Sequence, residues 1–275
     1  MKVVVSSAIG FCYGVRRAVD EILSVSRLEK IVTLGPLIHN AQVVKELEKK
    51  GIRVVHSLNE VNPEESLVIS SHGTRAEILN EAINKGIKII DLTCPELKKT
   101  RELMLRIQEE GYSILLLGDP GHSEVESLLS YVPRAKLIPP GEFPELALRG
   151  KIALFSQSTQ DGELLADLAQ KLISGGVGEL RVFNTVCSAT REKQNALRQL
   201  LPEVEGVIVV GGKNSANTKR LASIAQKSGK KTWHVEMAEE LQRDWFCGIS
   251  SVGVVSGAST PRETVEAVAQ FLLSL

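Results

Sequence analysis

Three of the four cysteines divide the chain into segments of similar length. Cys12 and Cys94 lie 82 residues apart and Cys94 and Cys187 lie 93 apart, whereas Cys247 falls outside this series. Thiolates are ligands for zinc and for iron–sulfur clusters. No Cys-x-x-Cys pair is present and the cysteines are few for the length, so neither a zinc ribbon nor a disulfide framework is expected.

The simplest alternative is that all four cysteines are structural thiols, because free cysteines are commonly buried as small apolar residues. Cys247, in Arg-Asp-Trp-Phe-Cys-Gly, is interpreted in this way, as a packing residue before a strand. The other three occupy equivalent places in an internal repeat. Each one ends an apolar, β-branched run and precedes apolar residues at helical spacing, with Pro95 or Ser188 as helix starts. The runs are MKVVVSSAIGFC, IKIIDLTC and LRVFNTVC.

The repeat continues after each of these predicted helices. A buried strand ends at a glycine that lies 23, 24 or 24 residues after its cysteine, at Gly35, Gly118 and Gly211. Four residues further on, a polar residue opens a second helix, at His39, His122 and Ser215. A short strand, a second buried strand with a polar tip, and a closing helix complete each unit. The polar-tipped strands read LVISSHGT, IALFSQST and VGVVSGAST.

We therefore predict an α/β protein made of three small, mostly parallel units, 13–94, 95–187 and 188–275, with residues 1–12 supplying the strand that the third unit lacks. A pseudo-threefold arrangement of these three lobes would aim the three cysteines at one central point, since ligands gather at the carboxyl ends of parallel strands. Zinc and an iron–sulfur cluster both suit three thiolates. A [4Fe–4S] cluster is favoured, because it usually takes four cysteines and three would leave one iron open for chemistry.

Several polar side chains fall at the same strand ends and favour a bound anion. They are His39, His72, His122, Ser158, Thr159, Ser215, Asn217 and Ser259. Helix N-termini offer free N–H groups and a positive dipole end, which suit a phosphate or diphosphate. Lys213 is the one obvious cation in the predicted anion pocket. The scarcity of cations favours a small enclosed anion over nucleic acid as the ligand. Glu124, in Gly-His-Ser-Glu, is a general-acid candidate, although a first-turn carboxylate can also simply complement the helix dipole.

Composition restricts the function classes further. The chain has 33 Lys and Arg against 33 Asp and Glu, which disfavours a strongly basic nucleic-acid binder. Aromatic residues make up only 4%, so stacking platforms for single-stranded nucleic acid are not expected. No apolar run is long enough to cross a membrane, and the N-terminus lacks the pattern of a secretory signal. A cytoplasmic protein without a membrane or nucleic-acid partner is the expectation.

These residues together resemble the 4-hydroxy-3-methylbut-2-enyl diphosphate reductase family, which carries out the last step of the methylerythritol phosphate route to isoprenoids. Nine motifs carry the resemblance, in order along the whole chain: Gly-Phe-Cys-Tyr-Gly-Val at 10–15, Ile-His-Asn at 38–40, Ser-His-Gly at 71–73, Asp-Leu-Thr-Cys-Pro at 91–95, Gly-His-Ser-Glu-Val at 121–125, Ser-Gln-Ser-Thr at 156–159, Asn-Thr-Val-Cys-Ser-Ala-Thr at 184–190, Gly-Lys-Asn-Ser at 212–215 and Ser-Gly-Ala-Ser-Thr-Pro at 256–261.

The resemblance implies an oxygen-sensitive [4Fe–4S] enzyme of three α/β lobes. It implies that an allylic diphosphate loses its hydroxyl group with two electrons and two protons, giving isopentenyl and dimethylallyl diphosphates. Cys12, Cys94 and Cys187 would hold the cluster, whose unique iron would bind the substrate hydroxyl as an alkoxide. Glu124 would deliver protons, with hydroxyls of the 156–159 loop in the relay. The diphosphate would be held by His39, His72, His122, Ser158, Ser215, Asn217 and Ser259. Electrons would come from an external donor such as ferredoxin or flavodoxin.

Two positions depart from the family pattern, and two other functions stay open. Ala216 stands where many members have Ser, and Ser158 stands where Thr is usual; neither change touches the cysteines or Glu124. A zinc hydrolase with three Cys ligands, acting on a phosphate ester, is one alternative. A non-catalytic electron carrier is another, although carriers usually supply four thiolates and need no anion pocket.

Overall fold

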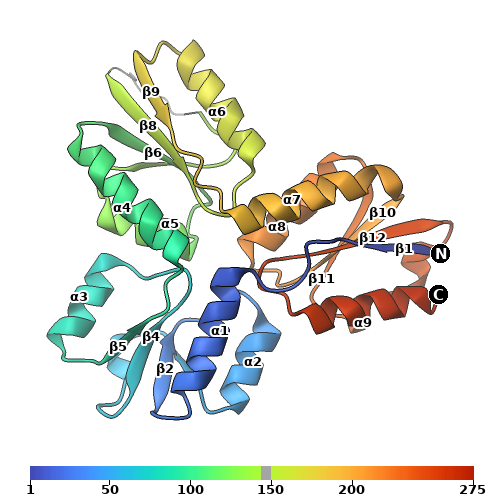
Figure 1. Ribbon diagram of the computed structural model, residues 1–275, viewed down its shortest axis with the longest axis horizontal. Helices are drawn as coiled ribbons and strands as arrows, with labels where there is room; N and C mark the ends of the chain where they lie inside the picture. The colour runs from blue at the N-terminus through green and yellow to red at the C-terminus, as the bar shows by residue number, and fades with distance from the viewer. Residues whose placement is uncertain (144–149) are drawn as a thin grey trace. The chain divides into compact units, whose positions relative to one another are not determined.

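The computed structural model describes residues 1–143 and 150–275 as alternating strands and helices (Figure 1). The strands of this described part form three four-stranded sheets, and every strand pair is parallel. The predicted fold class, three small parallel α/β units, is therefore confirmed. By contacts, residues 1–16, 39–43 and 188–275 form one unit and residues 17–38 and 44–187 the other. The boundaries at 13, 95 and 188 stay a prediction.

The first lobe is built around the sheet β3-β2-β4-β5 and lies mostly in the unit that starts at residue 17, although the first residues of its helices α1 and α2 are grouped with the other unit. Its elements are α1 Tyr13–Val25, β2 Ile31–Leu34, α2 Ala41–Lys49, β3 Arg53–Val55, β4 Ser66–Ile69, α3 Ala76–Asn84 and β5 Ile89–Asp91. The central strands β2 and β4 consist mainly of β-branched and aliphatic residues, as expected for parallel strands that are covered on both faces. Val32, Leu67 and Ile69 of this sheet pack with Ala82 of α3 in a buried cluster.

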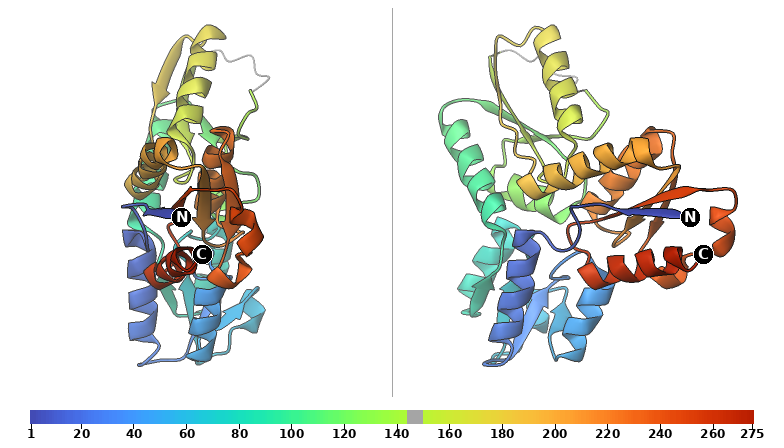
Figure 2. Two further views of the ribbon diagram at one scale, coloured as in Figure 1. Left: turned by 90° about the vertical axis from the view of Figure 1, so that its right-hand side faces the viewer. Right: turned by 45° about the vertical axis from the view of Figure 1, so that its right-hand side comes forward.

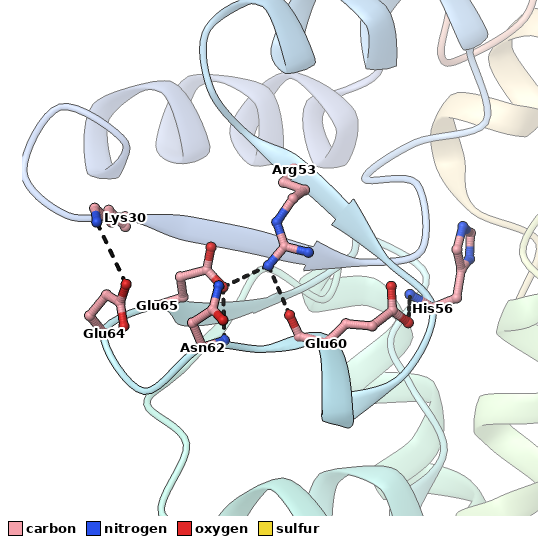
Figure 3. A network of polar contacts seen from close by, with 7 residues as sticks. All are labelled: Lys30, Arg53, His56, Glu60, Asn62, Glu64 and Glu65. Carbon is pink, nitrogen blue, oxygen red and sulfur yellow. Dashed lines mark hydrogen bonds and ion pairs between the residues drawn. The ribbon is translucent and has the colours of Figure 1, made fainter.

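A network of polar contacts ties the turn between β3 and β4 to the sheet (Figure 3). The Arg53 guanidinium donates to the Glu65 carboxylate and to the Glu60 carbonyl, both at 2.8 Å. The backbone N–H and side-chain amide of Asn62 each donate to the same Glu65 carboxylate at 2.9 Å. These bonds lower the pKa of Glu65 against the opposing effect of burial. The network therefore fixes the turn that leads into β4.

The second lobe belongs to the same unit and has the sheet β7-β6-β8-β9. Its elements are α4 Pro95–Glu109, β6 Ser113–Leu117, α5 Ser123–Tyr131, β7 Lys136–Ile138, β8 Lys151–Ser156, α6 Gly162–Ser174 and β9 Glu179–Val182. Alternate residues of its central strands enter different cores: Leu116 and Phe155 pack with residues of α4 and α5, and Leu117 and Leu154 pack with residues of α6. This explains why the interiors of these strands, residues 114–117 and 152–155, are apolar at every position.

The third lobe combines the two ends of the chain in the sheet β11-β10-β12-β1. Its elements are β1 Lys2–Val5, α7 Ser188–Leu200, β10 Gly206–Val210, α8 Ala216–Lys227, β11 Lys231–Val235, β12 Ser251–Ser256 and α9 Arg262–Leu273. Strand β1 pairs with β12 in the position that β5 and β9 hold in their own sheets. Figure 2 shows the N- and C-termini on this lobe in both views. The other short elements are 3₁₀ turns at Leu58–Glu60, Leu201–Glu203, Ala238–Glu240 and Arg243–Phe246.

The expectation that Cys247 is a packing residue is wrong. Cys247 is exposed at the end of a 3₁₀ turn, whereas the preceding Phe246 is buried. Phe246 lies 5.3 Å from the Trp233 ring between centroids, and Trp233 stacks on Trp245 at 6.1 Å and 6°. The larger aromatic side chain therefore takes the core position, and the cysteine is left outside. Among the described residues, no helix is both long and apolar enough to cross a bilayer.

The core of the second lobe depends on Phe155, which is fully buried and stacks on Phe183 with ring centroids 4.6 Å apart. Replacing Phe155 with Ala removes this contact and leaves a cavity, so the free energy of unfolding should fall by about 3–5 kcal/mol. Leu28→Ala is the control, since Leu28 is exposed and should change stability by less than about 0.5 kcal/mol. Urea denaturation of the metal-free chain, followed by circular dichroism, measures both; equal stability losses would contradict this packing.

Candidate functional site

The three cysteines of the repeat lie at equivalent strand-to-helix junctions. Each one immediately precedes a helix, α1, α4 or α7, as the sequence predicts. In each case its backbone N–H donates to a carbonyl in the loop that follows the adjacent strand, β12, β4 or β8. The three hydrogen bonds are all 3.0 Å long and run from Cys12 to Ala258, from Cys94 to Ser71 and from Cys187 to Ser158. The repeat is therefore present in hydrogen bonding as well as in sequence.

The cysteine sulfurs lie at helix N-termini and are half-buried. The Cys12 sulfur accepts the backbone N–H of Val15 at 3.5 Å. Burial raises the pKa of the Cys94 thiol, opposed by the backbone N–H groups of Glu96 and Leu97 that point at the sulfur. The charges of Cys187 and Glu124 also raise the pKa of Cys94, so these three groups interact within one unit. Among the described residues no three metal-binding side chains already gather at one point, and Cys12 belongs to the other unit.

Glu124 is a buried carboxylate whose two oxygens are both held by Ser158. It lies in the first turn of α5 with a side chain only 5% exposed. Its Oε1 accepts the Ser158 backbone N–H at 2.6 Å, and its Oε2 accepts the Ser158 hydroxyl at 2.7 Å. Short, charge-assisted hydrogen bonds of this kind fix a carboxylate firmly. Because the Ser158 carbonyl accepts from Cys187, the carboxylate and the cysteine junction share one loop residue.

His72 and His122 lie beside each other in the same unit as Glu124. Their rings meet edge to face, with centroids 6.1 Å apart and planes at 89°. His122 is the N-cap of α5, and its Nδ1 accepts the Glu124 backbone N–H at 3.2 Å. A ring nitrogen that accepts carries no proton, so the neutral ring has its proton on Nε2. The segment directly after His72 lies against α5: Gly73 has a φ of +76°, and a Cβ there would lie 2.8 Å from the Ser127 hydroxyl.

His39 and Ser259 come together in the other unit. The Ser259 hydroxyl donates to the His39 carbonyl at 3.2 Å, and the Asn40 amide donates to the Ser259 carbonyl at 2.8 Å. Gly212 approaches so closely that an added Cβ would lie 2.4 Å from the same His39 carbonyl. His39 does not open its helix as predicted. α2 begins at Ala41 and is capped by Asn40, whose Oδ1 accepts the N–H groups of the second and third helical residues.

Ser215 and Asn217 lie at the N-terminus of α8. Ser215 caps this helix, since its hydroxyl oxygen accepts the Thr218 backbone N–H at 3.4 Å. Asn217 is only 3% exposed, and neither its Oδ1 nor its Nδ2 has a hydrogen-bond partner among the described residues. An unpaired buried amide costs about 1–3 kcal/mol, which favours a ligand that supplies the missing bonds. Ala216, the departure from the family pattern, buries its methyl group at the first helical position.

Two basic residues behave differently from the sequence interpretation. Lys213, the one cation expected at the anion site, donates instead to the Glu240 carboxylate at 2.7 Å, which raises the pKa of the lysine. Arg17 of α1 was not singled out from the sequence. Its Nη2 donates to the carbonyls of Leu92 and Thr93, at 2.9 and 3.0 Å, directly before Cys94. Arg17 therefore holds the loop that carries this cysteine.

A groove with a volume of about 580 Å³ lies in the first lobe, away from these residues. It is lined by Ser26–Ile31, Lys50, Gly51, Arg53 and Glu65. None of the predicted site residues lines it, and it lies where β2 begins, opposite to the strand end at Gly35. Ligands of parallel α/β folds bind at the carboxyl ends of strands. Three of its charged side chains are also paired within the structure, Arg53 with Glu65 and Glu29 with Lys88. We therefore assign it no role in the site.

The raised pKa of the Cys94 thiol predicts its reactivity in the metal-free chain. A thiol whose pKa lies above the ordinary value carries less thiolate at pH 8, and the thiolate is the form that reacts with iodoacetamide. Cys94 should therefore be alkylated several-fold more slowly than the exposed Cys247 at pH 8, and its rate should rise as the pH is raised further. Peptide mass spectrometry after timed quenching measures both rates in one sample, with Cys247 as the internal control. Faster alkylation of Cys94 than of Cys247 would contradict this environment.

The chain matches the family model described as LytB protein over residues 3–273. It is 39% identical over 274 residues to a protein of Syntrophotalea carbinolica named 4-hydroxy-3-methylbut-2-enyl diphosphate reductase, covering 98% of each chain. A relative of the same name from Anaeromyxobacter sp. is 39% identical over 283 residues and covers 100% of this chain and 98% of its own. The match is thus continuous along the chain.

Two solved structures are also similar. One is described as (E)-4-hydroxy-3-methyl-but-2-enyl diphosphate reductase, the terminal enzyme of the non-mevalonate pathway. It is 35% identical, covers all of both chains and superimposes with a TM-score of 0.68. The other is the E-1-hydroxy-2-methyl-but-2-enyl-4-diphosphate reductase of Plasmodium falciparum. It is 26% identical, covers 100% of this chain and 87% of its own, and has a TM-score of 0.90.

Proposed function

The chain belongs to the LytB protein family, and we propose that it reduces 4-hydroxy-3-methylbut-2-enyl diphosphate to isopentenyl diphosphate and dimethylallyl diphosphate. The relatives and solved structures named as this reductase support the reaction class. The observation that carries the proposal is the buried Glu124 carboxylate, which is held by Ser158 and interacts electrostatically with Cys94, a cysteine of the repeat.

The proposed reaction breaks the allylic C–O bond of the substrate. Two electrons from an external donor, such as ferredoxin or flavodoxin, reduce the allyl group. One proton leaves with the hydroxyl oxygen as water, and a second proton is added to a carbon of the allyl group. Addition at one end or the other gives the two isomeric products. The protein must therefore supply electrons, protons and a fixed diphosphate in one enclosed place.

The donor set suits a [4Fe–4S] cluster with one open iron. Cys94 and Cys187 interact electrostatically in one unit, and we propose that Cys12 of the other unit is the third ligand. All three have the same junction geometry and lie at helix N-termini, which stabilise thiolates. When bound, such a cluster supplies electrons singly and an iron position that accepts the substrate hydroxyl. A zinc site would leave the electron supply unexplained.

Glu124 and Ser158 hold and move the protons in this proposal. The carboxylate is buried, so a proton placed on it is shielded from bulk water. The Ser158 hydroxyl is its direct partner at 2.7 Å, and a hydroxyl both donates and accepts, so it can pass a proton to or from Oε2. The Ser158 side chain needs only its hydroxyl for this role. The absence of the threonine methyl at this position therefore leaves the relay intact.

The diphosphate is held by neutral donors in this proposal. Asn217 has an unpaired buried amide at the α8 N-terminus, beside the capping Ser215. His122 has its Nε2 proton as a donor once Nδ1 accepts from Glu124, and His39, His72 and Ser259 complete the set. Phosphate oxygens accept several hydrogen bonds and favour the positive end of a helix. Ala216 supplies no hydroxyl, so its backbone N–H remains the group that can donate at this position.

The decisive experiment compares metal content with turnover. We expect anaerobically purified protein to be brown, to contain iron and acid-labile sulfide, and to convert the allylic diphosphate to both products with a chemical reductant and mediator. Products are measured by mass spectrometry. A colourless chain with stoichiometric zinc that cleaves phosphate esters would establish the hydrolase alternative. A cluster-loaded chain without any turnover would favour an electron carrier.

The proton-donor role is tested by Glu124→Gln. This variant keeps the size of the side chain but replaces the carboxyl group, which can donate a proton, with an amide, which cannot. Turnover should therefore fall by about 100-fold or more, while the iron and sulfide contents stay at the wild-type level. Glu126→Gln is the matched control, because Glu126 lies on the same helix, two residues away, with its side chain 43% exposed. It should retain the wild-type rate. Wild-type turnover in Glu124→Gln would refute the assigned role.

A further inference from the structure

Lys193 is a buried lysine on α7 that the reaction described above does not use. Its side chain is only 6% exposed, and its ammonium group donates to the carbonyls of Ala8 and Gly10, at 3.0 and 3.1 Å. These carbonyls precede Cys12 in the chain, and all four residues belong to the same unit. Lys193 therefore holds the loop that presents Cys12, from a helix that begins directly after another cysteine of the repeat.

The ammonium group of Lys193 has no carboxylate within ion-pair distance among the described residues. Two neutral carbonyls only partly compensate a buried charge, which costs several kcal/mol to remove from water. Burial accordingly lowers the pKa of Lys193 to about 8, and the negative charges of Cys12 and of the neighbouring Glu192 act in the opposite direction. Further negative charge near Cys12, which cluster binding would add, would offset the cost of burying the Lys193 ammonium group.

Arg17 makes a similar tether but with a different electrostatic setting. It donates to the two carbonyls before Cys94, and its Nη1 also pairs with the Glu21 carboxylate at 2.9 Å. Its side chain is 25% exposed, so water and Glu21 screen its charge. Lys193 lacks both kinds of screening. Two of the cysteine loops are thus held by cations, but only at Cys12 is the cation buried and without an acidic partner.

We propose that Lys193 is a positioning residue for the cluster, which holds the Cys12 loop by two hydrogen bonds and supplies the positive charge that balances the cluster. This inference rests on the proposed function, because it requires a cluster at Cys12. A [4Fe–4S] core with three thiolate ligands carries a net negative charge, and reduction adds one further negative charge. A nearby buried cation stabilises the reduced form more than the oxidised form, and so raises the reduction potential.

Three substitutions of Lys193 distinguish the effect of its hydrogen bonds to the Cys12 loop from the effect of its positive charge. Lys193→Arg keeps both the charge and the donors, Lys193→Gln keeps donors but no charge, and Lys193→Met removes both. Arg191→Gln is the matched control, since it removes one positive charge from an exposed position of the same helix. Each variant is reconstituted anaerobically with iron and sulfide. Its reduction potential is measured by a dye-mediated spectroscopic titration, and its iron loss by transfer to a chelator.

We expect a lower reduction potential in both Lys193→Gln and Lys193→Met, and wild-type potentials in Lys193→Arg and Arg191→Gln. Iron loss should be about 10-fold faster or more in Lys193→Met, since supporting residues of this kind change metal affinity by about 10- to 100-fold. A tether without an electrostatic role would change iron loss but leave the potential of Lys193→Gln unchanged. An unchanged potential in that variant therefore overturns the charge assignment. If Lys193→Met does not fold, the comparison of Gln with Arg decides the question.

Failure of the proposed function gives a different result. A wild-type chain that binds neither iron nor sulfide would refute the cluster, and with it the balancing charge. The tether is then judged in the cluster-free chain by amide hydrogen exchange of residues 8–12. Faster exchange in Lys193→Met than in Arg191→Gln supports the tether, and equal exchange overturns it.

Discussion

The hydrogen bond from each cysteine N–H to the loop after a neighbouring strand is the constraint on which the site depends. It joins the end of one strand to the start of one helix, and it recurs at the same length at Cys12, Cys94 and Cys187. The bond fixes each cysteine at a helix N-terminus and holds the loop after the neighbouring strand beside it. At Cys187 the bonded residue is Ser158, whose own N–H and hydroxyl hold Glu124. One backbone bond thus links a thiol to the buried carboxylate.

Much of the fold was predictable because its causes are local. Strands such as β10 are covered on both faces, so every residue is apolar and the run is visible in the sequence. Gly35 and Gly211 end their strands with positive φ, which residues with a Cβ rarely adopt. Pro95 begins α4 because its missing N–H is not needed there. The candidate site residues follow these signals directly, so the same pattern indicates the strand ends at which they lie.

The remaining site features depend on partners far away in the sequence. His39 and Asn40 are adjacent polar residues, and only the backbone path decides that Asn40 caps α2 while His39 offers its carbonyl to Ser259. Arg17 has the appearance of a solvated helix charge until its bonds to the loop before Cys94 are known. One sequence feature indicates that Lys193 is buried: it lies four and seven residues before Leu197 and Leu200, on the apolar face of α7. A lysine on this apolar face indicates a buried charge, but the sequence does not show which groups it bonds to.

The distribution of charge separates Lys193 from the other cations near the site. Lys213 is neutralised by Glu240 and Arg17 by Glu21, so neither contributes a full charge to a bound group. An ion-paired cation has little effect on a charged group nearby, because its partner cancels most of the cation's electric field. A buried ammonium that is held only by carbonyls keeps its field. Negative charge beside it would offset the cost of burying it, so the Cys12 loop would be most stable with the proposed cluster in place. Zero net charge over the chain is compatible with this arrangement, since the field that matters comes from one uncompensated group in a medium of low dielectric constant.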